Sequence, residues 1–275
     1  MKTVKTKLLI VLLLLMALPL TIFSQDENKR PKYITVTTGH WNMDYENFDK
    51  EKWIAIEKEF LDKVVKKNEF IQGSSIYLHR YTPDNSEIVF VNSYGSWADI
   101  EKANERSQEL IKEAWKDEAK RKAYFKNKDA YYSVEHSDEI YAPIGNAKLL
   151  KPEDAKKELV WLAIKGHFAF PEDGSKEEFE SLTNEYIDNV INKNDLIKGY
   201  FQHGHAWGSD KTEFTRVFAV DNMTDLDKIG EKNNEIFKAY MPDEIKRKDF
   251  NKKVMKYFTP VHGDFIYTSV PELSK

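Results

Sequence analysis

Apolar residues recur with two different periods along the chain, and together they predict helices and strands in a fixed order. Helical spacing relates Trp53, Ile56, Phe60 and Val64, and again Phe179, Leu182, Tyr186 and Val190. Stretches rich in β-branched and aromatic residues predict strands at Tyr33–His40, Ser75–Tyr81, Glu87–Tyr94, Leu159–His167, Tyr200–Trp207 and Glu213–Val220. Further helices are expected to begin after Ser96 and Asn222. A last strand in each half contains a His-x-Asp sequence, at His136–Asp138 and His262–Asp264. Each half of the chain therefore reads strand, helix, strand, strand, helix, strand.

The two halves are copies of one unit. Lys120–Tyr141 returns as Lys246–Tyr267 with nine of 22 positions identical, and Lys67–Gly73 returns as Lys193–Gly199. A repeat of this length exceeds solenoid units, which run about 20–50 residues. We therefore expect two duplicated domains, residues 32–144 and 158–270, joined by a linker at residues 145–157 that contains Pro152 and a run of charges.

The predicted element order is that of the split βαβ, or ferredoxin-like, unit, which places this chain in the α+β class. Such a four-stranded antiparallel sheet carries helices on one face only, so its other face must be covered. Two tandem copies can cover each other by packing sheet against sheet. We expect an intramolecular barrel, and hence a monomer, because the barrel is completed within one chain.

In element order and duplication the chain resembles the dimeric α/β-barrel superfamily over nearly all of residues 32–270. That superfamily includes antibiotic-biosynthesis-monooxygenase-like, EthD-like and haem-degrading or chlorite-dismutase-like members. The sequence contains no catalytic motif of a named member, so the resemblance assigns no site residue.

The first residues have the pattern of a cleavable secretory signal. Three lysines precede the apolar run Leu8–Leu20, which ends near Ser24 before a charged segment. The run is shorter than the roughly 20 residues that a membrane-spanning helix needs, so an uncleaved anchor is the weaker alternative. We expect residues 1–24 to be removed after Ser24 and the protein to be secreted or periplasmic, with no membrane attachment thereafter.

Net charge and cysteine content exclude several classes of function. The net charge of −4 becomes −7 without the three lysines of residues 1–24, which argues against a nucleic-acid partner. The chain contains no cysteine, so neither disulfides nor thiol catalysis is available.

Strand alternation suggests which side chains face the space between the two sheets. With Ile76 and Leu78 toward the helices, the expected inward set in the second strands is Tyr77, His79, Tyr81, Phe201, His203, His205 and Trp207. The expected inward set in the third strands is Phe90, Asn92, Tyr94, Arg216, Phe218 and Val220. We predict a binding site for a small hydrophobic or aromatic molecule from Tyr77, His79, Tyr81, His203, His205, Trp207 and Arg216. The alternative is that the aromatic side chains simply fill a solid core.

The histidines could also form a metal site or provide a general base. His203 and His205 share a strand face and could chelate a metal, but no acidic residue has the spacing to complete a site, and we predict none. His136 with Asp138, and His262 with Asp264, could orient a general base; with no nucleophile nearby, structural pairs are the preferred interpretation.

Haem would need one axial histidine, and no spacing selects one. Asn222-Met-Thr224 matches a glycosylation pattern, although a helix cap is favoured there.

Three functions are therefore compatible with the sequence. The first is binding of a small hydrophobic or aromatic molecule between the sheets. The second is an oxygenase-type enzyme, either cofactor-independent or haem-dependent. The third is a structural or protein-interaction module with a solid core.

Overall fold

The computed structural model describes residues 30–275, so the predicted signal at residues 1–24 lies outside the described residues. The first repeat comprises β1 (Tyr33–Trp41), α2 (Lys50–Lys63), η1 (Val65–Lys67), β2 (Gly73–Tyr81), β3 (Glu87–Tyr94), α3 (Trp97–Ala114), α4 (Glu118–Asp129) and β4 (Tyr132–Pro143). The second comprises β5 (Val160–Phe168), α5 (Lys176–Tyr186), η2 (Ile187–Ile191), β6 (Ile197–Trp207), β7 (Glu213–Val220), α6 (Met223–Tyr240), α7 (Glu244–Met255), β8 (Phe258–Ser269) and η3 (Pro271–Leu273). Within residues 30–275 no helix is both long and apolar enough to cross a membrane.

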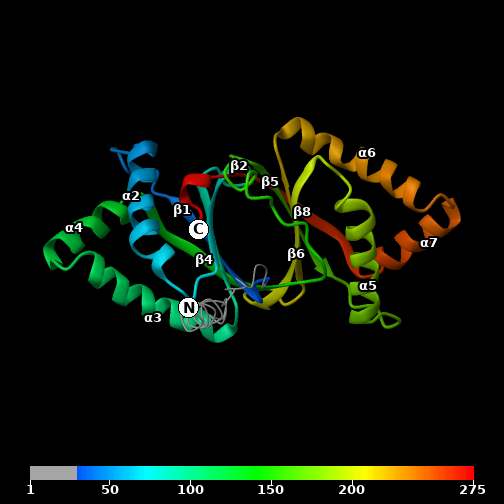
Figure 1. Cartoon of the computed structure of the whole chain (residues 1–275), viewed down its shortest axis with the longest axis horizontal. Coiled ribbons are helices and arrows are strands. Elements are labelled where there is room, and N and C mark those ends of the chain that lie inside the picture. Colours follow the sequence, from blue (N-terminus) through cyan, green and yellow to red (C-terminus); the bar gives the residue numbers. More distant parts are fainter. Residues whose placement is uncertain (1–29) are drawn as a thin grey trace, which may run out of the picture. The chain divides into compact units, whose positions relative to one another are not determined.

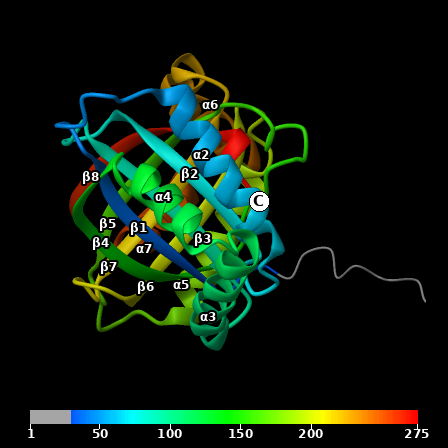
Figure 2. The ribbon, with the colours of Figure 1, turned by 90° about the vertical axis from the view of Figure 1, so that its left-hand side faces the viewer.

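The eight strands form one closed barrel in the order β1-β3-β2-β8-β5-β7-β6-β4. Each repeat contributes four neighbouring strands, β4-β1-β3-β2 and β8-β5-β7-β6, so the two sheets have the same internal order. The helices of each repeat lie outside its own sheet, and the two sheets face each other in the middle (Figure 1). Figure 2 looks onto α2, α3 and α4 where they cross the outer face of the first sheet. The predicted α+β barrel of two ferredoxin-like repeats is confirmed.

Helix starts follow the sequence signals. The side chain of Ser175 accepts a hydrogen bond from the backbone N–H of Glu178 at 3.1 Å, and Ser96 accepts one from Asp99 at 3.2 Å. Asn222 accepts the N–H of Asp225 at 2.9 Å, which confirms the helix cap in that position. Each cap satisfies a backbone donor that the first helical turn leaves unpaired.

The barrel closes at two short seams, each between one strand of either repeat. At one seam β2 pairs with β8, where His79 lies opposite Tyr267; at the other β6 pairs with β4, where His205 lies opposite Tyr141. Each seam contains four registered residue pairs and one bulge or irregularity. Pairing within a sheet is longer: β1 and β3 are registered over eight residue pairs. The seams are thus the shorter pairings of the barrel.

A tyrosine secures each seam by reaching a glutamate of the other repeat. Tyr141 donates to a carboxylate oxygen of Glu213 at 2.6 Å and also to Glu139. Tyr267 donates to Glu87 at 3.1 Å. Tyr141 and Tyr267 occupy equivalent places in the repeats, as do Glu87 and Glu213, so the two contacts are related by the pseudo-symmetry of the barrel.

The segment that follows the last strand of each repeat docks on the other repeat. After β4, the N–H of Ile144 donates to Gln202 and that of Lys148 to Tyr200. After β8, the N–H of Val270 donates to Ile76 and that of Lys275 to Ser74. Ser74 and Tyr200, like Ile76 and Gln202, are repeat equivalents, so the repeats exchange equivalent segments. The first part of the predicted linker therefore forms contacts equivalent to those of the C-terminal segment.

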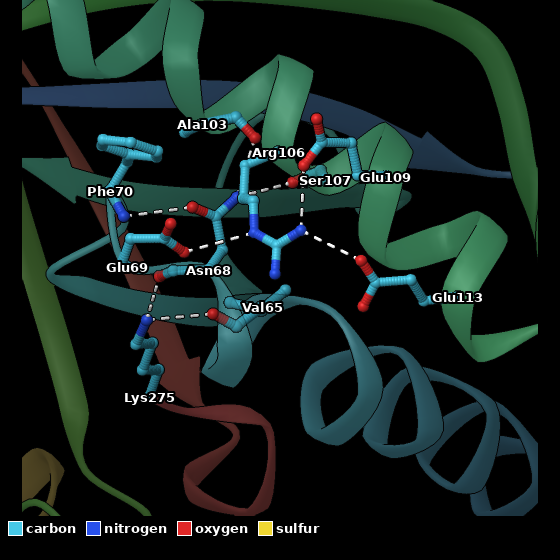
Figure 3. Close-up of polar contacts among 10 residues, drawn as sticks. All are labelled: Val65, Asn68, Glu69, Phe70, Ala103, Arg106, Ser107, Glu109, Glu113 and Lys275. Carbon is cyan, nitrogen blue, oxygen red and sulfur yellow. Dashed lines mark hydrogen bonds and ion pairs between the residues drawn. The ribbon is translucent and has the colours of Figure 1, made fainter.

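Each exchanged segment ends on a lysine that binds backbone carbonyl groups where the other repeat's first helix ends. The ammonium group of Lys275 donates to the carbonyl oxygens of Val65 at 3.0 Å and Asn68 at 2.6 Å (Figure 3). That of Lys148 donates to Ile191 at 3.2 Å and Asn194 at 2.7 Å. Carbonyl groups at a helix end lack partners within the helix, so a cation there satisfies them.

The two carbonyl sites are held in place by buried asparagines. The amide of Asn68 donates to the carbonyl oxygen of Ala103 at 2.7 Å and to the hydroxyl of Ser107 at 2.9 Å, which ties the end of the first helix to α3 (Figure 3). Asn194 repeats the arrangement with Asn233 of α6 at 2.8 Å. Both asparagines are completely buried. Buried hydrogen bonds within each repeat therefore hold the docking sites in place.

Leu273 anchors the C-terminal segment, because its side chain is buried in the same apolar cluster as Trp53 of α2. We expect Leu273→Ala to lower the free energy of unfolding by about 2–5 kcal/mol, through lost apolar burial and the cavity left behind. Urea denaturation of residues 25–275 measures it. The matched control is Leu149→Ala in the half-exposed part of the other segment, with an expected change within about 0.5 kcal/mol. Equal effects of the two substitutions would contradict this role for the C-terminal segment.

Candidate functional site

A cavity of about 330 Å³ lies inside the barrel, and we call it the barrel cavity. All eight strands contribute side chains to its wall. Most of the lining is apolar, including Ile34, Val36, Val91, Ala163 and Val217. A largely apolar cavity of this size with a few polar groups is the usual form of a small-molecule site.

The two repeats contribute unlike walls to the barrel cavity. In the second repeat Lys165, Thr215 and His203 lie side by side on β5, β7 and β6, because Thr215 is registered with both of the others. The equivalent row of the first repeat is Thr38, Val89 and Tyr77. All six side chains line the barrel cavity. The row of the second repeat contains a lysine and a histidine, which the equivalent row of the first repeat lacks.

Two buried polar atoms on this wall have no hydrogen-bond partner among the described residues: the indole nitrogen of Trp161 and the hydroxyl oxygen of Thr215. Each side chain belongs to a residue that is 8% exposed. Buried polar groups in proteins are normally paired, so a lone donor beside a cavity suggests that something in the cavity pairs with it. The ring of Trp161 is held edge-to-face by Tyr77, with ring centres 5.1 Å apart, and stacks on Phe201 at 6.2 Å.

Tyrosines of the barrel are strongly held in the neutral form. Burial raises the pKa of Tyr77 to about 12. The pKa of Tyr141 is raised by burial and by the carboxylates of Glu139 and Glu213. Burial and Glu87 raise the pKa of Tyr267 in the same way. These hydroxyl groups therefore act as hydrogen-bond donors at neutral pH.

Of the seven predicted site residues, Tyr77 and His203 line the barrel cavity. Four others, His79, Tyr81, His205 and Trp207, follow them along β2 and β6 but lie beyond the cavity. Tyr81 and Trp207 are 63% and 66% exposed, and His79 has a ring nitrogen 2.8 Å from the hydroxyl of Thr82. All four lie within the seam pairings, farther along β2 and β6 than the part of each strand that lines the cavity.

The predicted inward face of the third strands was wrong. Phe90 lies directly opposite Ile76 in the sheet, and directly opposite residues share a face, so Phe90 points toward the helices with Ile76. Val89 and Val91 line the barrel cavity instead. Arg216, the equivalent of Phe90, likewise lies on the helix side, 5.8 Å from the ring centre of Phe258. Arg216 is therefore outside the barrel cavity.

Both predicted His–Asp pairs form, and both are exposed. His136 lies 3.4 Å from Asp138, and His262 lies 3.9 Å from Asp264, with every side chain more than half exposed. None of these residues lines the barrel cavity. An exposed ion pair of this kind contributes about 0–1 kcal/mol to stability.

Two closer His–Asp pairs were not predicted. His40 lies 3.3 Å from Asp84, and the equivalent His167 lies 3.0 Å from Asp210. Each joins the end of a first strand to the turn between the second and third strands. The repeat alignment of these residues was visible in the sequence, but their contact depends on strand pairing. In the described part of the chain, no three His, Asp or Glu side chains are grouped as a metal site would require.

A second, smaller cavity of about 120 Å³ lies between α2 and the first sheet, and we call it the helix-side cavity. Glu57, which is 5% exposed, accepts a hydrogen bond from Tyr132 at 2.5 Å and pairs with Lys128 at 2.8 Å. Trp53 in turn donates to the hydroxyl of Tyr132 at 2.7 Å. Glu57 and Lys128 both line this cavity.

The second repeat has no counterpart of this buried charge. The residues equivalent to Trp53, Glu57, Lys128 and Tyr132 are, in order, Phe179, Thr183, Val254 and Phe258. Phe179 and Phe258 pack in one apolar cluster there. Burying an ion pair carries a desolvation penalty. The first repeat alone bears this penalty, which makes the helix-side cavity a candidate site in its own right.

Burial of Tyr77 predicts a pH effect on stability. An unfolded tyrosine ionises near pH 10, whereas the folded pKa is about 12. Stability from this group is therefore complete below about pH 10 and falls by up to about 1.4 kcal/mol per pH unit as the pH rises toward the folded pKa. In urea denaturation at about pH 9 and about pH 11, Tyr77→Phe is expected to show a smaller fall than the wild type. The exposed Tyr81→Phe should match the wild type, and equal slopes for all three proteins would contradict the assignment.

No protein-family model matches the sequence, and no curated protein matches it. Solved structures do share the fold. A proposed monooxygenase from Fusobacterium nucleatum superposes with a TM-score of 0.54 at 10% identity, covering 88% of this chain and 94% of that one. For a proposed monooxygenase from Lactobacillus acidophilus the values are 0.50 and 7%, with coverage of 88% and 94%.

The chlorite dismutase of Candidatus Nitrospira defluvii superposes with a TM-score of 0.51 at 13% identity, covering 89% of this chain and 93% of that one. At these identities the likeness concerns the fold alone. The chain has the dimeric α+β-barrel fold of these proteins, with both halves of the barrel in one chain.

Proposed function

We propose that this protein binds a small, largely apolar molecule in the barrel cavity. The observation that carries the proposal is the cavity itself: about 330 Å³, lined mainly by apolar side chains from both repeats. Protein interiors are packed to crystal-like density, so a solid-core module would not leave such a space. The unpartnered donors of Trp161 and Thr215 support a ligand with at least one hydrogen-bond acceptor.

Binding of a neutral, environment-sensitive dye tests this function. N-phenyl-1-naphthylamine should gain fluorescence with residues 25–275. Ala163→Phe places a ring inside the barrel cavity and should weaken dye binding roughly tenfold or more by occupying the space. Ala119→Phe adds the same ring on the exposed surface of α4 and should bind like the wild type.

The binding function would be contradicted if the wild type bound neither the dye nor any member of a panel of small aromatic molecules. Equal binding by the wild type and a folded Ala163→Phe protein would also contradict it, since the dye would then lie elsewhere. Circular dichroism of each variant establishes that it is folded.

A second candidate function is an oxygenase-type enzyme, and the helix-side cavity is the observation that favours it. The carboxylate of Glu57 is buried beside this cavity and paired with Lys128. A positioned carboxylate can serve as the general base that removes a proton from an organic substrate. Such a proton must leave before a cofactor-independent oxygenase substrate reacts with O₂. The fold shared with proposed monooxygenases is compatible with this chemistry.

Oxygen uptake with a panel of phenols and hydroquinones tests the enzyme function. Glu57→Gln preserves the shape of the side chain but removes the base, and uptake should fall by about 100-fold or more. The control Glu59→Gln changes a neighbouring glutamate whose partner is Lys63 on the same helix, and it should retain wild-type uptake. Uptake no greater than the protein-free rate would remove this candidate.

A haem-dependent oxygenase would hold its haem in the barrel cavity. Among the described residues lining it, His203 is the histidine that could serve as an axial ligand. Added haemin should then give a Soret band with the wild type and a shifted or absent band with His203→Ala. Absence of a Soret band with the wild type would exclude the haem-dependent enzyme.

Localisation and assembly complete the proposal. From the sequence we propose that residues 1–24 direct export and are removed after Ser24. We also propose a monomer, because the strand pairing that closes the barrel lies within one chain. The mass of the exported protein and its size in solution test the two statements.

A further inference from the structure

The polar row of the second repeat has the chemistry of an anion site. Lys165, Thr215 and His203 are immediate neighbours on three adjacent strands, and their side chains line the barrel cavity. Side chains directly opposite each other in antiparallel strands stand about 4.5–5.5 Å apart. A single ligand group can therefore contact more than one of them. Lysine offers only donors and a positive charge, and threonine adds a hydroxyl.

The duplication supplies an internal comparison for this row. In the first repeat its three places are held by Thr38, Val89 and Tyr77, which carry no charge at neutral pH. The two rows occupy equivalent strands of one barrel and line one cavity, so the fold by itself does not require a lysine there. The positive charge and the buried hydroxyl are specific to one wall of the cavity.

The charge of Lys165 is only weakly compensated by the protein. Its nearest carboxylate is that of Glu213, at 4.0 Å, and Glu213 already accepts a hydrogen bond from Tyr141 at 2.6 Å. The ammonium group also lies 5.4 Å from the ring centre of Phe265. Next to it, the hydroxyl of Thr215 is buried and has no partner among the described residues. A carboxylate ligand would satisfy both groups with charge-assisted hydrogen bonds.

We propose that the ligand of the barrel cavity is an apolar monocarboxylic acid. Its carboxylate lies at the row formed by Lys165, Thr215 and His203, and its apolar body lies along the aliphatic wall of the first repeat at Ile34, Val36 and Val91. The inference rests on the proposed binding function and names the chemical class of its ligand. Burial of the apolar body supplies affinity, and the row selects for the acid.

The test compares 2-naphthoate with 2-naphthamide, which has nearly the same shape without the charge. By isothermal titration calorimetry at neutral pH, the wild type should bind the acid roughly tenfold or more tightly than the amide. Lys165→Thr installs the residue of the first repeat and should remove the preference, so that acid and amide bind with affinities within about threefold of each other. Thr215→Val likewise installs the residue of the first repeat, and it should also weaken binding of the acid.

Lys211→Thr is the matched control, because it removes the same charge from an exposed turn outside the cavity. It should retain wild-type preference for the acid. Circular dichroism and urea denaturation of Lys165→Thr show whether this variant is folded.

The outcomes separate the two proposals. Binding of neither compound, nor of the neutral dye, would overturn the binding function itself. Equal affinity of the wild type for acid and amide would overturn the ligand class and leave the binding function standing. A preference for the acid that survives Lys165→Thr, or that Lys211→Thr abolishes, would also overturn the assignment of the row.

Discussion

Closure of the barrel at two short seams is the constraint on which the rest of this structure depends. Each sheet would expose one apolar face alone, and only strand pairing between repeats turns the two faces into one interior. Each seam has only four registered pairs, so backbone pairing is supplemented from both sides. Tyr141 and Tyr267 cross to glutamates of the opposite repeat, while Lys148 and Lys275 bind carbonyl groups at the opposite helix ends. Each repeat thereby holds the other in the position that encloses the cavity.

The pseudo-symmetry of the barrel makes the differences between the repeats informative. Contacts that build the fold occur twice: the helix caps, the buried asparagines and the exchanged segments. The groups of the two candidate sites occur once. Lys165 and Thr215 face the barrel cavity from the second repeat only, and the buried Glu57–Lys128 pair belongs to the first repeat only. The equivalent places of the other repeat form the same unit without these groups, so the fold alone does not account for them.

The two cavities differ in the chemistry they can support. The barrel cavity is larger and mostly apolar, and its two unpartnered polar groups, those of Trp161 and Thr215, belong to the second repeat. Such a site can bind and orient a ligand, with the apolar wall supplying affinity and the donors supplying direction. The helix-side cavity is smaller, and its buried carboxylate, Glu57, is already paired with Lys128 and accepts a hydrogen bond from Tyr132. Removing either partner of such a pair strongly destabilises the protein, because the other partner is left buried and unpaired.

The sequence by itself determined the duplication, the order of elements and the barrel, because periodicity and repeat spacing record which residues are buried along each element. It also placed the helix caps at Ser96, Ser175 and Asn222, which depend on local hydrogen bonds. Of the predicted site residues, Tyr77 and His203 line the barrel cavity. Only the tertiary structure decided the face of Arg216, because the register between strands fixes which side chains share a face, and single-strand alternation leaves two choices. The tertiary structure also decided how far the cavity extends along β2 and β6, which leaves His79, Tyr81, His205 and Trp207 outside it. The row of Lys165, Thr215 and His203 joins residues distant along the chain that are neighbours only across paired strands.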